Sequence, residues 1–133
     1  MNKILVAYDG GEPAHRALKL AAELAHQFEA KVGVVSVVPD YPGRVPVALW
    51  DDRAVHATEL AEAKAILAEH GIMPVLYEPA GDPAGSIEKI AEDGGYDMVI
   101  VGSRGLGALS RALQGSVSEH VATHAQATVV VAR

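Results

Sequence analysis

The stretch "DMVIVGSRGLGALSRALQGSVSEH", residues 97–120, joins a continuous apolar run to a segment rich in glycine. The run 97–102 is β-branched and nearly free of polar side chains, which is typical of a strand buried on both faces of a sheet. Gly102, Gly105 and Gly107 follow where this strand is expected to end. Open parallel sheets bind ligands beyond the carboxyl ends of their strands, so the stretch predicts both a fold and a site.

Four further apolar runs predict strands of the same kind, separated by amphipathic patterns. The alternation of strand and helix predicts an α/β fold with three layers, α/β/α, around a doubly wound parallel sheet with right-handed crossovers. At 133 residues the chain has room for a single domain, residues 1–133. The four further strands are expected at 3–8, 31–38, 73–78 and 127–132.

Apolar side chains at helical spacing predict the helices between the strands. We expect a fourth helix at about 116–124, and Gly71 to follow the end of the second. Asp82 before a proline and the pair Gly94–Gly95 predict the start and stop of the third. The expected buried faces are Ala14, Ala17, Leu18, Ala21, Leu24, Ala25 and Phe28 in the first helix, Leu60, Ala63, Ile66 and Leu67 in the second, and Ile87, Ile90 and Ala91 in the third.

Charge and composition exclude several classes of function. Acidic side chains outnumber basic ones by 17 to 11, and the net charge of −6 disfavours non-specific binding to nucleic acid or anionic membranes. The absence of cysteine excludes disulfides, iron–sulfur clusters and thiolate zinc sites. No apolar run approaches the roughly 18 residues of a membrane span, and the apolar start of the chain is too short for a signal peptide. We therefore expect a cytoplasmic protein.

The glycine-rich segment predicts a phosphate-binding site. Gly102 and Gly105 leave main-chain amides accessible, and Gly115–Ser116 begins a predicted helix whose amino end favours an anion. The alternative is structural, because "SVSE" at 116–119 also fits a capping box. No P-loop lysine motif is present. The residues alone leave both interpretations open.

The spacing Gly102-x2-Gly105-x9-Gly115-Ser116 resembles the ATP-binding signature G-x2-G-x9-G-[ST] of the universal stress protein family. "KILVAYDGGEPAHRAL" (3–18) resembles the family's first strand, acidic turn and first helix, and "ATVVVAR" (127–133) its closing strand. The resemblance covers the whole chain. It implies a five-stranded parallel sheet of order 3-2-1-4-5, the Rossmann-like fold of the adenine nucleotide alpha hydrolase-like proteins.

The resemblance also implies a ligand, ATP, lying across the ends of the first and fourth strands, with Mg²⁺ or Mn²⁺ held mainly by its phosphates. Asp9 matches the acidic residue that bonds the ribose, although a carboxylate at this turn could instead cap the first helix. No protein metal ligand is implied. The remaining implied contacts are Ala7 and Val37 near the adenine, and Val101, Gly102, Gly105, Gly115, Ser116 and Val117 near the phosphates.

The expected function is that of a nucleotide-dependent stress-response sensor or regulator with an unidentified protein partner. Phosphoryl transfer needs an aligned nucleophile and carboxylates for a metal, and neither is evident, so we predict at most slow ATP hydrolysis. The alternative is a nucleotide-independent dimeric interaction or chaperone-like module. The resemblance implies a homodimer formed through strand 127–132, an apolar edge that invites pairing; a monomer is the alternative.

Three other features allow two interpretations each. Residues 39–50, with three prolines, form either a plain surface connection or a loop over the site. Arg104 and Arg111 either offset phosphate charge or are solvated. His120 and His124 have a spacing that can hold a metal, but without a third ligand we expect surface histidines.

Overall fold

The computed structural model describes the backbone of residues 1–8, 10–36, 38–39, 49–81, 83–102 and 127–132. Within these ranges, the description does not extend to the side chains of residues 38–39, 49–56, 81 and 83–84. The elements in chain order are β1 (Lys3–Ala7), α1 (Glu12–Phe28), β2 (Lys31–Val35), β3 (Val38–Pro39), α2 (Leu49–Glu69), β4 (Val75–Tyr77), β5 (Ala80–Gly81), α3 (Pro83–Asp93), β6 (Met98–Gly102) and β7 (Thr128–Ala132).

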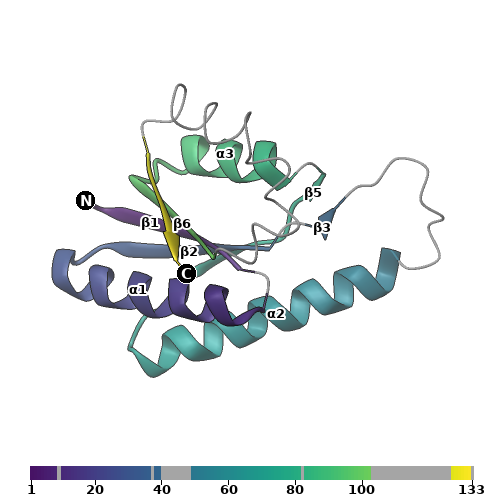
Figure 1. The fold of residues 1–133 in the computed structure, drawn as a ribbon, viewed down its shortest axis with the longest axis horizontal. Helices are drawn as coiled ribbons and strands as arrows, with labels where there is room; N and C mark the ends of the chain where they lie inside the picture. The colour runs from purple at the N-terminus through teal and green to yellow at the C-terminus, as the bar shows by residue number, and fades with distance from the viewer. Residues whose placement is uncertain (9, 37, 40–48, 82, 103–126, 133) are drawn as a thin grey trace.

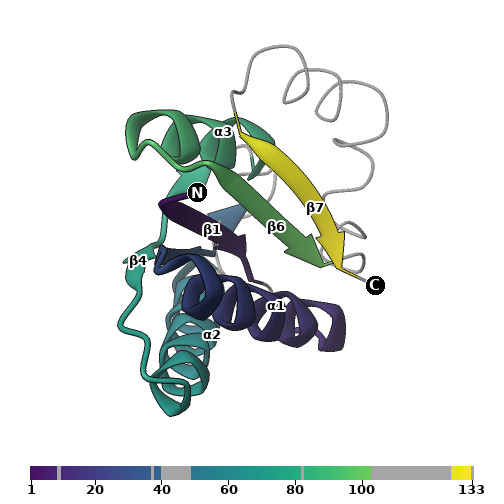
Figure 2. The ribbon, with the colours of Figure 1, turned by 90° about the vertical axis from the view of Figure 1, so that its left-hand side faces the viewer.

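The main sheet has five strands in the order β4-β2-β1-β6-β7, and every neighbouring pair is parallel. Counted along this sheet, the order is 3-2-1-4-5, which confirms the predicted topology. Helices α1 and α2 lie on one face of the sheet and α3 on the other (Figures 1 and 2). The predicted three-layer α/β/α arrangement is therefore confirmed.

The core is divided by the sheet into two clusters. On β1, Ile4 and Val6 pack with α1 and α2, whereas Leu5 packs with the residues that face α3. All three side chains are fully buried. Both faces of the central strand are thus covered, as its continuous apolar sequence predicts.

The predicted helical faces are largely confirmed. Eight of the predicted residues in α1 and α2 are buried, each with less than a tenth of its surface exposed, whereas Phe28 is 48 % exposed, so its prediction was wrong. Phe28 is the last residue of α1, and the chain leaves the helix at Glu29 in the left-handed conformation. In α3, Ile87 and Ala91 are buried as expected. The eight buried residues of α1 and α2 are Ala14, Ala17, Leu18, Ala21, Ala25, Leu60, Ala63 and Leu67.

Two predicted boundaries need correction. The strand expected at 31–38 ends at Val35, where Ser36 N–H donates to the carbonyl of Tyr77, and Val38–Pro39 pairs instead with Ala80–Gly81 in a second, two-stranded sheet. Such short strands carry no periodicity that a sequence could reveal. Helix α2 begins at Leu49, inside the loop expected at 39–50. Residues 40–48 and the helix expected at 116–124 lie outside the described residues.

At the amino edge of the sheet, Asp97 joins the starts of β1 and β6. Its carboxylate accepts the amide hydrogens of Asn2 at 2.7 Å and Lys3 at 3.0 Å. These two bonds lower the pKa of Asp97 because they stabilise the charged form, and the bond from Asn2 has the larger effect. The contact therefore stabilises the fold above the pH at which the unfolded carboxyl titrates, and the stabilisation is lost as the pH falls through the lower pKa of the folded state.

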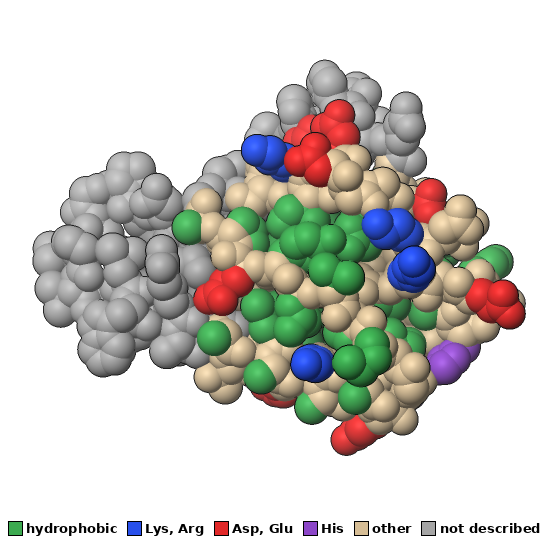
Figure 3. Space-filling model, turned by 180° about the vertical axis from the view of Figure 1, so that it is seen from behind, with side chains coloured by type: hydrophobic (Ala, Val, Ile, Leu, Met, Phe, Trp, Pro, Cys, Tyr) green, Lys and Arg blue, Asp and Glu red, His purple; other side chains and the backbone are tan. Residues whose placement is uncertain are grey.

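One surface of the molecule shows the β4 edge (Figure 3). Hydrophobic side chains gather on this face between acidic and basic groups. Val75 and Leu76 of β4 are exposed, as is Met73, which precedes this strand. In the part of the chain that the structure describes, no helix combines the length and apolar character that a membrane crossing requires.

Beneath α3, Tyr96 occupies space that two glycines leave. A Cβ atom on Gly33 of β2 would lie 2.2 Å from the Tyr96 hydroxyl oxygen, and one on Gly94 would lie 2.5 Å from the ring. The Tyr96 hydroxyl forms a hydrogen bond of 2.8 Å with Tyr77. Burial and this bond raise the pKa of Tyr96 well above its ordinary value. Gly33 is therefore needed for packing.

We predict that Gly33→Ala destabilises the protein by about 3 kcal/mol, because the new methyl group overlaps a buried ring that cannot move freely. Gly95→Ala is the control: Gly95 has φ +68° but open space around its Cβ position, so its cost should be about 1 kcal/mol. Urea unfolding of the two variants measures both values. Equal costs would contradict this account of Gly33.

Candidate functional site

Three strands end together at the carboxyl edge of the sheet. Ala7, the last residue of β1, is the register partner of Val35 on β2 and of Val101 on β6. The next residue continues the pairing, since Tyr8 N–H donates to the Val35 carbonyl at 2.9 Å. From β1 the chain builds the sheet first towards β2 and β4, and later towards β6 and β7. The carboxyl ends of β1 and β6 thus form the point at which strand order reverses, the usual ligand site of such folds.

The structure brings together three of the predicted site residues. Ala7 and Val101 pack in the same cluster on the α3 side of the sheet, and Gly102 is the last residue of β6. Ala7 is small and only partly buried, so no large side chain of its own fills the middle of this edge. The other predicted site residues lie outside the described residues: Asp9, Val37, Gly105, Gly115, Ser116 and Val117.

Gly102 has a packing role that its sequence motif did not reveal. A Cβ atom at this position would lie 2.7 Å from the Ala14 nitrogen and 2.8 Å from the Pro13 carbonyl carbon. Both are backbone atoms of the first turn of α1, which therefore rests directly on the end of β6. The close packing of α1 on β6 therefore requires glycine at position 102. The contact of Gly102 with a ligand stays a prediction.

The turn from β1 to α1 is built from two glycines. Gly10 has φ +81°, a left-handed conformation that favours glycine, and Gly11 is the N-cap of α1 with no side-chain capping bond. The N-cap position of α1 therefore belongs to Gly11 and not to Asp9. Asp9 itself lies outside the described residues.

Helix α2 contacts this turn from the side. A Cβ atom on Gly10 would lie 3.4 Å from both Cγ and Oε1 of Glu59. The other carboxylate oxygen of Glu59 accepts a hydrogen bond of 3.2 Å from Ser36 Oγ. Ser36 is 1 % exposed and directly follows β2. The Glu59 side chain of α2 thus lies close to Gly10, which follows Asp9, and bonds to Ser36, which precedes Val37.

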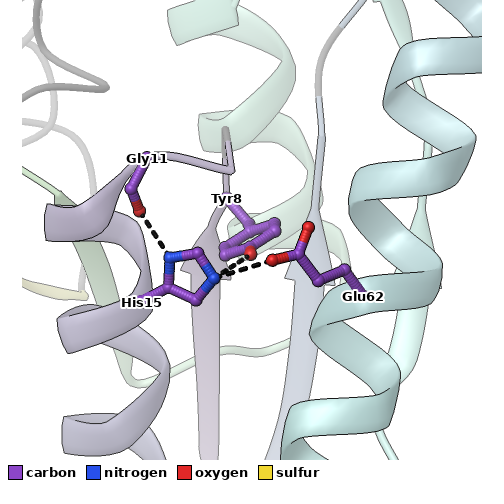
Figure 4. Close-up of polar contacts among 4 residues, drawn as sticks. All are labelled: Tyr8, Gly11, His15 and Glu62. Atoms are coloured by element: carbon purple, nitrogen blue, oxygen red, sulfur yellow. Dashed lines mark hydrogen bonds and ion pairs between the residues drawn. The ribbon is translucent and has the colours of Figure 1, made fainter.

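A second contact between the turn and α2 passes through His15 (Figure 4). His15 Nδ1 lies 2.9 Å from the Gly11 carbonyl oxygen. Its Nε2 atom lies 2.8 Å from Glu62 Oε1 and 3.0 Å from the Tyr8 hydroxyl. Sequence analysis assigned no role to this histidine, and Glu62 stands 47 residues away, a separation at which no sequence pattern signals contact.

The described residues contain no group of three or more His, Asp or Glu side chains arranged to hold a metal ion. His120, His124, Arg104 and Arg111 fall in the range 103–126, which the structure leaves undescribed.

Comparison with known proteins identifies the family. The universal stress protein family model matches residues 1–133. This chain belongs to the universal stress protein family. A universal stress protein of Thermus aquaticus is 33 % identical, over 98 % of this chain and 97 % of its own length. The universal stress protein YxiE of Bacillus subtilis is 29 % identical, over 99 % of both chains.

Solved structures of universal stress proteins share the fold. A family member from Burkholderia pseudomallei is 30 % identical, with a TM-score of 0.75 over 98 % of this chain and 94 % of that one. An Archaeoglobus fulgidus protein in complex with dAMP has a TM-score of 0.76 at 24 % identity, covering 100 % and 98 % of the two chains. An Arabidopsis thaliana protein with AMP bound has a TM-score of 0.70 at 22 % identity, covering 99 % and 91 %.

The close contact at Gly102 leads to a test by substitution. Gly102→Ala should destabilise the fold by about 1–3 kcal/mol, because the added methyl group meets backbone atoms and the first turn of α1 must move. Urea unfolding measures the cost, and the amide chemical shifts of residues 11, 12, 14 and 15 report the displacement. Unchanged unfolding together with unchanged shifts would contradict the contact.

Proposed function

We propose that this universal stress protein binds ATP, accompanied by Mg²⁺ or Mn²⁺, at the carboxyl edge of β1 and β6. It acts in the cytoplasm as a homodimeric, nucleotide-dependent regulator in the stress response. ATP hydrolysis is at most slow. The alternative of a nucleotide-independent interaction or chaperone-like module makes the opposite prediction for nucleotide binding.

One observation carries the proposal. The register of Ala7 with Val35 and Val101 makes three segments leave the sheet at one edge. These segments contain Asp9 after β1, Val37 after β2 and the glycine-rich run after β6. We therefore expect three groups around one switch point of the sheet: a residue that bonds the ribose, a residue that contacts the adenine, and hydrogen-bond donors to the phosphates.

The chemistry of these residues fits an adenine nucleotide. A carboxylate at position 9 can accept hydrogen bonds from two ribose hydroxyls, and position 9 is not the cap of α1. In the proposed site, Ala7 and Val37 flank the base. Val101 and Gly102 begin the phosphate side. Gly105 leaves space beside the phosphates. Main-chain amides of Gly115, Ser116 and Val117 donate to the phosphates, and Ser116 adds its hydroxyl.

The solved relatives support the ligand class. The Archaeoglobus and Arabidopsis proteins were crystallised with dAMP and AMP, and a further universal stress protein with cAMP. These complexes belong to those proteins, whose identity to this chain is 22–24 %. They support the proposal because the shared fold has the same carboxyl edge.

The proposed role is regulatory. Fast phosphoryl transfer requires carboxylates for the metal and a residue that orients the attacking oxygen. In the proposed site the phosphates and water hold most of the divalent ion. A protein that binds ATP and turns it over slowly is suited to report nucleotide occupancy to a partner.

Isothermal titration calorimetry with ATP and Mg²⁺ tests the binding claim. We expect saturable binding by the unaltered chain and its loss in Gly115→Val, because the side chain would occupy the phosphate site. Ala68→Val, which introduces the same valine side chain at an exposed position of α2, should bind as the unaltered chain does.

Two results would oppose this proposal. No heat and no shift in melting temperature at millimolar ATP would favour the nucleotide-independent module. Rapid release of ADP would instead identify an enzyme.

The homodimer is proposed through β7. This strand is at the end of the sheet order, and Val129 and Val131, two residues apart on one face, are 39 % and 45 % exposed. An apolar edge strand without proline readily pairs with a second copy of itself. A two-fold contact of this kind closes on itself and produces a dimer.

Val131→Lys should therefore shift the protein from dimer to monomer in sedimentation velocity, because two lysines would meet near the two-fold axis. Met73→Lys is the control, since Met73 is 74 % exposed beside β4 at the opposite edge. A dimer that survives Val131→Lys but dissociates in Met73→Lys would place the interface at β4.

A further inference from the structure

We propose that the open edge of β4 is a docking surface for an extended segment of a partner protein, in which apolar residues alternate and an acidic residue lies at one end. The segment adds a strand beside β4 and places its acidic side chain near Lys31. The inference goes beyond nucleotide binding, because it gives the chemistry by which this edge recognises another protein.

The backbone of β4 directs hydrogen-bonding groups away from the sheet. β4 lies at one end of the five-stranded sheet, beside β2. The Tyr77 carbonyl points to β2, because it accepts the N–H of Ser36 at 3.0 Å. Backbone groups alternate in direction along a strand, so the N–H and carbonyl of Leu76 point away from β2. An extended peptide can therefore pair with β4 from that side.

The side chains of this edge are apolar and exposed. Val75 is 55 % exposed and shares a face of the sheet with Tyr77, which packs against the cluster beneath α3. Leu76 points to the opposite face and is 37 % exposed. Met73, just before the strand, is 74 % exposed. A peptide strand with apolar residues at alternate positions would cover Val75 and Tyr77 with side chains on their face, and such burial stabilises a complex.

Two lysines lie on the same face of the sheet as Val75. Lys3 of β1 and Lys31 of β2 are register partners, so their side chains leave neighbouring strands on one face. Lys31 is exposed and stands two residues before Gly33, the register partner of Val75. Basic and hydrophobic side chains are neighbours on the surface that shows the β4 edge (Figure 3). Like charges at opposite positions repel each other, so an acidic group is attracted to this place.

The surroundings compensate the charge of Lys3 more than that of Lys31. The Lys3 amine lies 4.7 Å from the centre of the Tyr96 ring, and the carboxylate of Asp97 accepts the Lys3 backbone N–H. Among the residues whose side chains are described, Lys31 forms no side-chain hydrogen bond and no ion pair, and the exposed Glu29 two residues away is not paired with it. Lys31 is therefore the cation that an incoming carboxylate can meet.

A partner segment fits this edge better than a second copy of β4 does. The edge segment "MPVLY" (73–77) has no acidic residue, so a second β4 would bring no negative charge to the face that carries Lys31. Glu78 comes next, and strand alternation directs it with Leu76 to the opposite face. Pro74 has no N–H, which removes one pairing donor from each strand of a symmetric pair.

Selection from a phage-displayed library of random peptides of about twelve residues tests the proposal, with the full chain immobilised and no nucleotide added. We expect the enriched peptides to combine alternating β-branched or aromatic residues with an acidic residue at one end. The charge reversal Lys31→Glu should instead enrich peptides with a basic residue at that end. The control Lys19→Glu makes the same change at an exposed position of α1 and should enrich the same peptides as the unaltered chain.

A synthetic copy of one enriched peptide then measures affinity and location. Fluorescence anisotropy should give a Kd about tenfold higher for Lys31→Glu, because attraction is replaced by repulsion. Val75→Ser should raise the Kd about fivefold, because an apolar contact is lost at a position that is exposed in the free protein. Hydrogen exchange at the Leu76 amide should slow when the peptide binds, because strand addition gives that amide a hydrogen bond.

Each opposing result would overturn the inference. Either no enriched peptide, or a Kd unchanged in both Lys31→Glu and Val75→Ser, would show that the β4 edge is not the docking surface. An unchanged exchange rate at Leu76 would exclude strand addition. A smaller assembly of Val75→Ser in sedimentation velocity, without peptide, would identify a second copy as the occupant. Since no nucleotide is present, failure here leaves the proposed ATP site untouched, and failure to bind ATP leaves this inference untouched.

Discussion

The central strand β1 is the constraint on which the remaining structure depends. It is paired on both sides, to β2 and β6, and covered on both faces, by α1 and α2 on one side and by α3 on the other. Its register determines where its neighbours end. Because Ala7 lies between Val35 and Val101, the turn to α1 and the segments after β2 and β6 all begin at one edge. A change in that register would separate the residues of the proposed site.

The fold could be predicted closely from the sequence, and the reason is physical. Strands buried on both faces are typically continuous β-branched runs, and the run "MVIVG" in β6 has this pattern. Helix faces were equally clear, since Ala17, Leu18 and Ala21 recur at helical spacing. Phe28 and the start of α2 were mispredicted because both depend on where a helix ends, which neighbouring contacts decide.

The candidate site could be predicted only in part. Small residues at strand ends, such as Ala7 and Gly102, leave a visible pattern in the sequence. The packing of Gly102 against Pro13 and Ala14, and the contacts of Glu59 and Glu62 with the β1–α1 turn, join segments far apart in the chain. No local pattern encodes such contacts. The contact of Glu59 helps to explain why glycines follow Asp9. Gly10 adopts φ +81° and lies close to the Glu59 side chain.

The central claim is that an adenine nucleotide lies across the carboxyl ends of β1 and β6. Backbone amide shifts of the isotopically labelled protein, titrated with ATP and Mg²⁺, test it most directly. The account predicts large shifts at Tyr8 to Gly11, at Ser36 and at Val101 to Gly102, with little change at the amino edge around Asn2 and Asp97. Shifts confined to the amino edge or to α3, or none at saturating ATP, would contradict it.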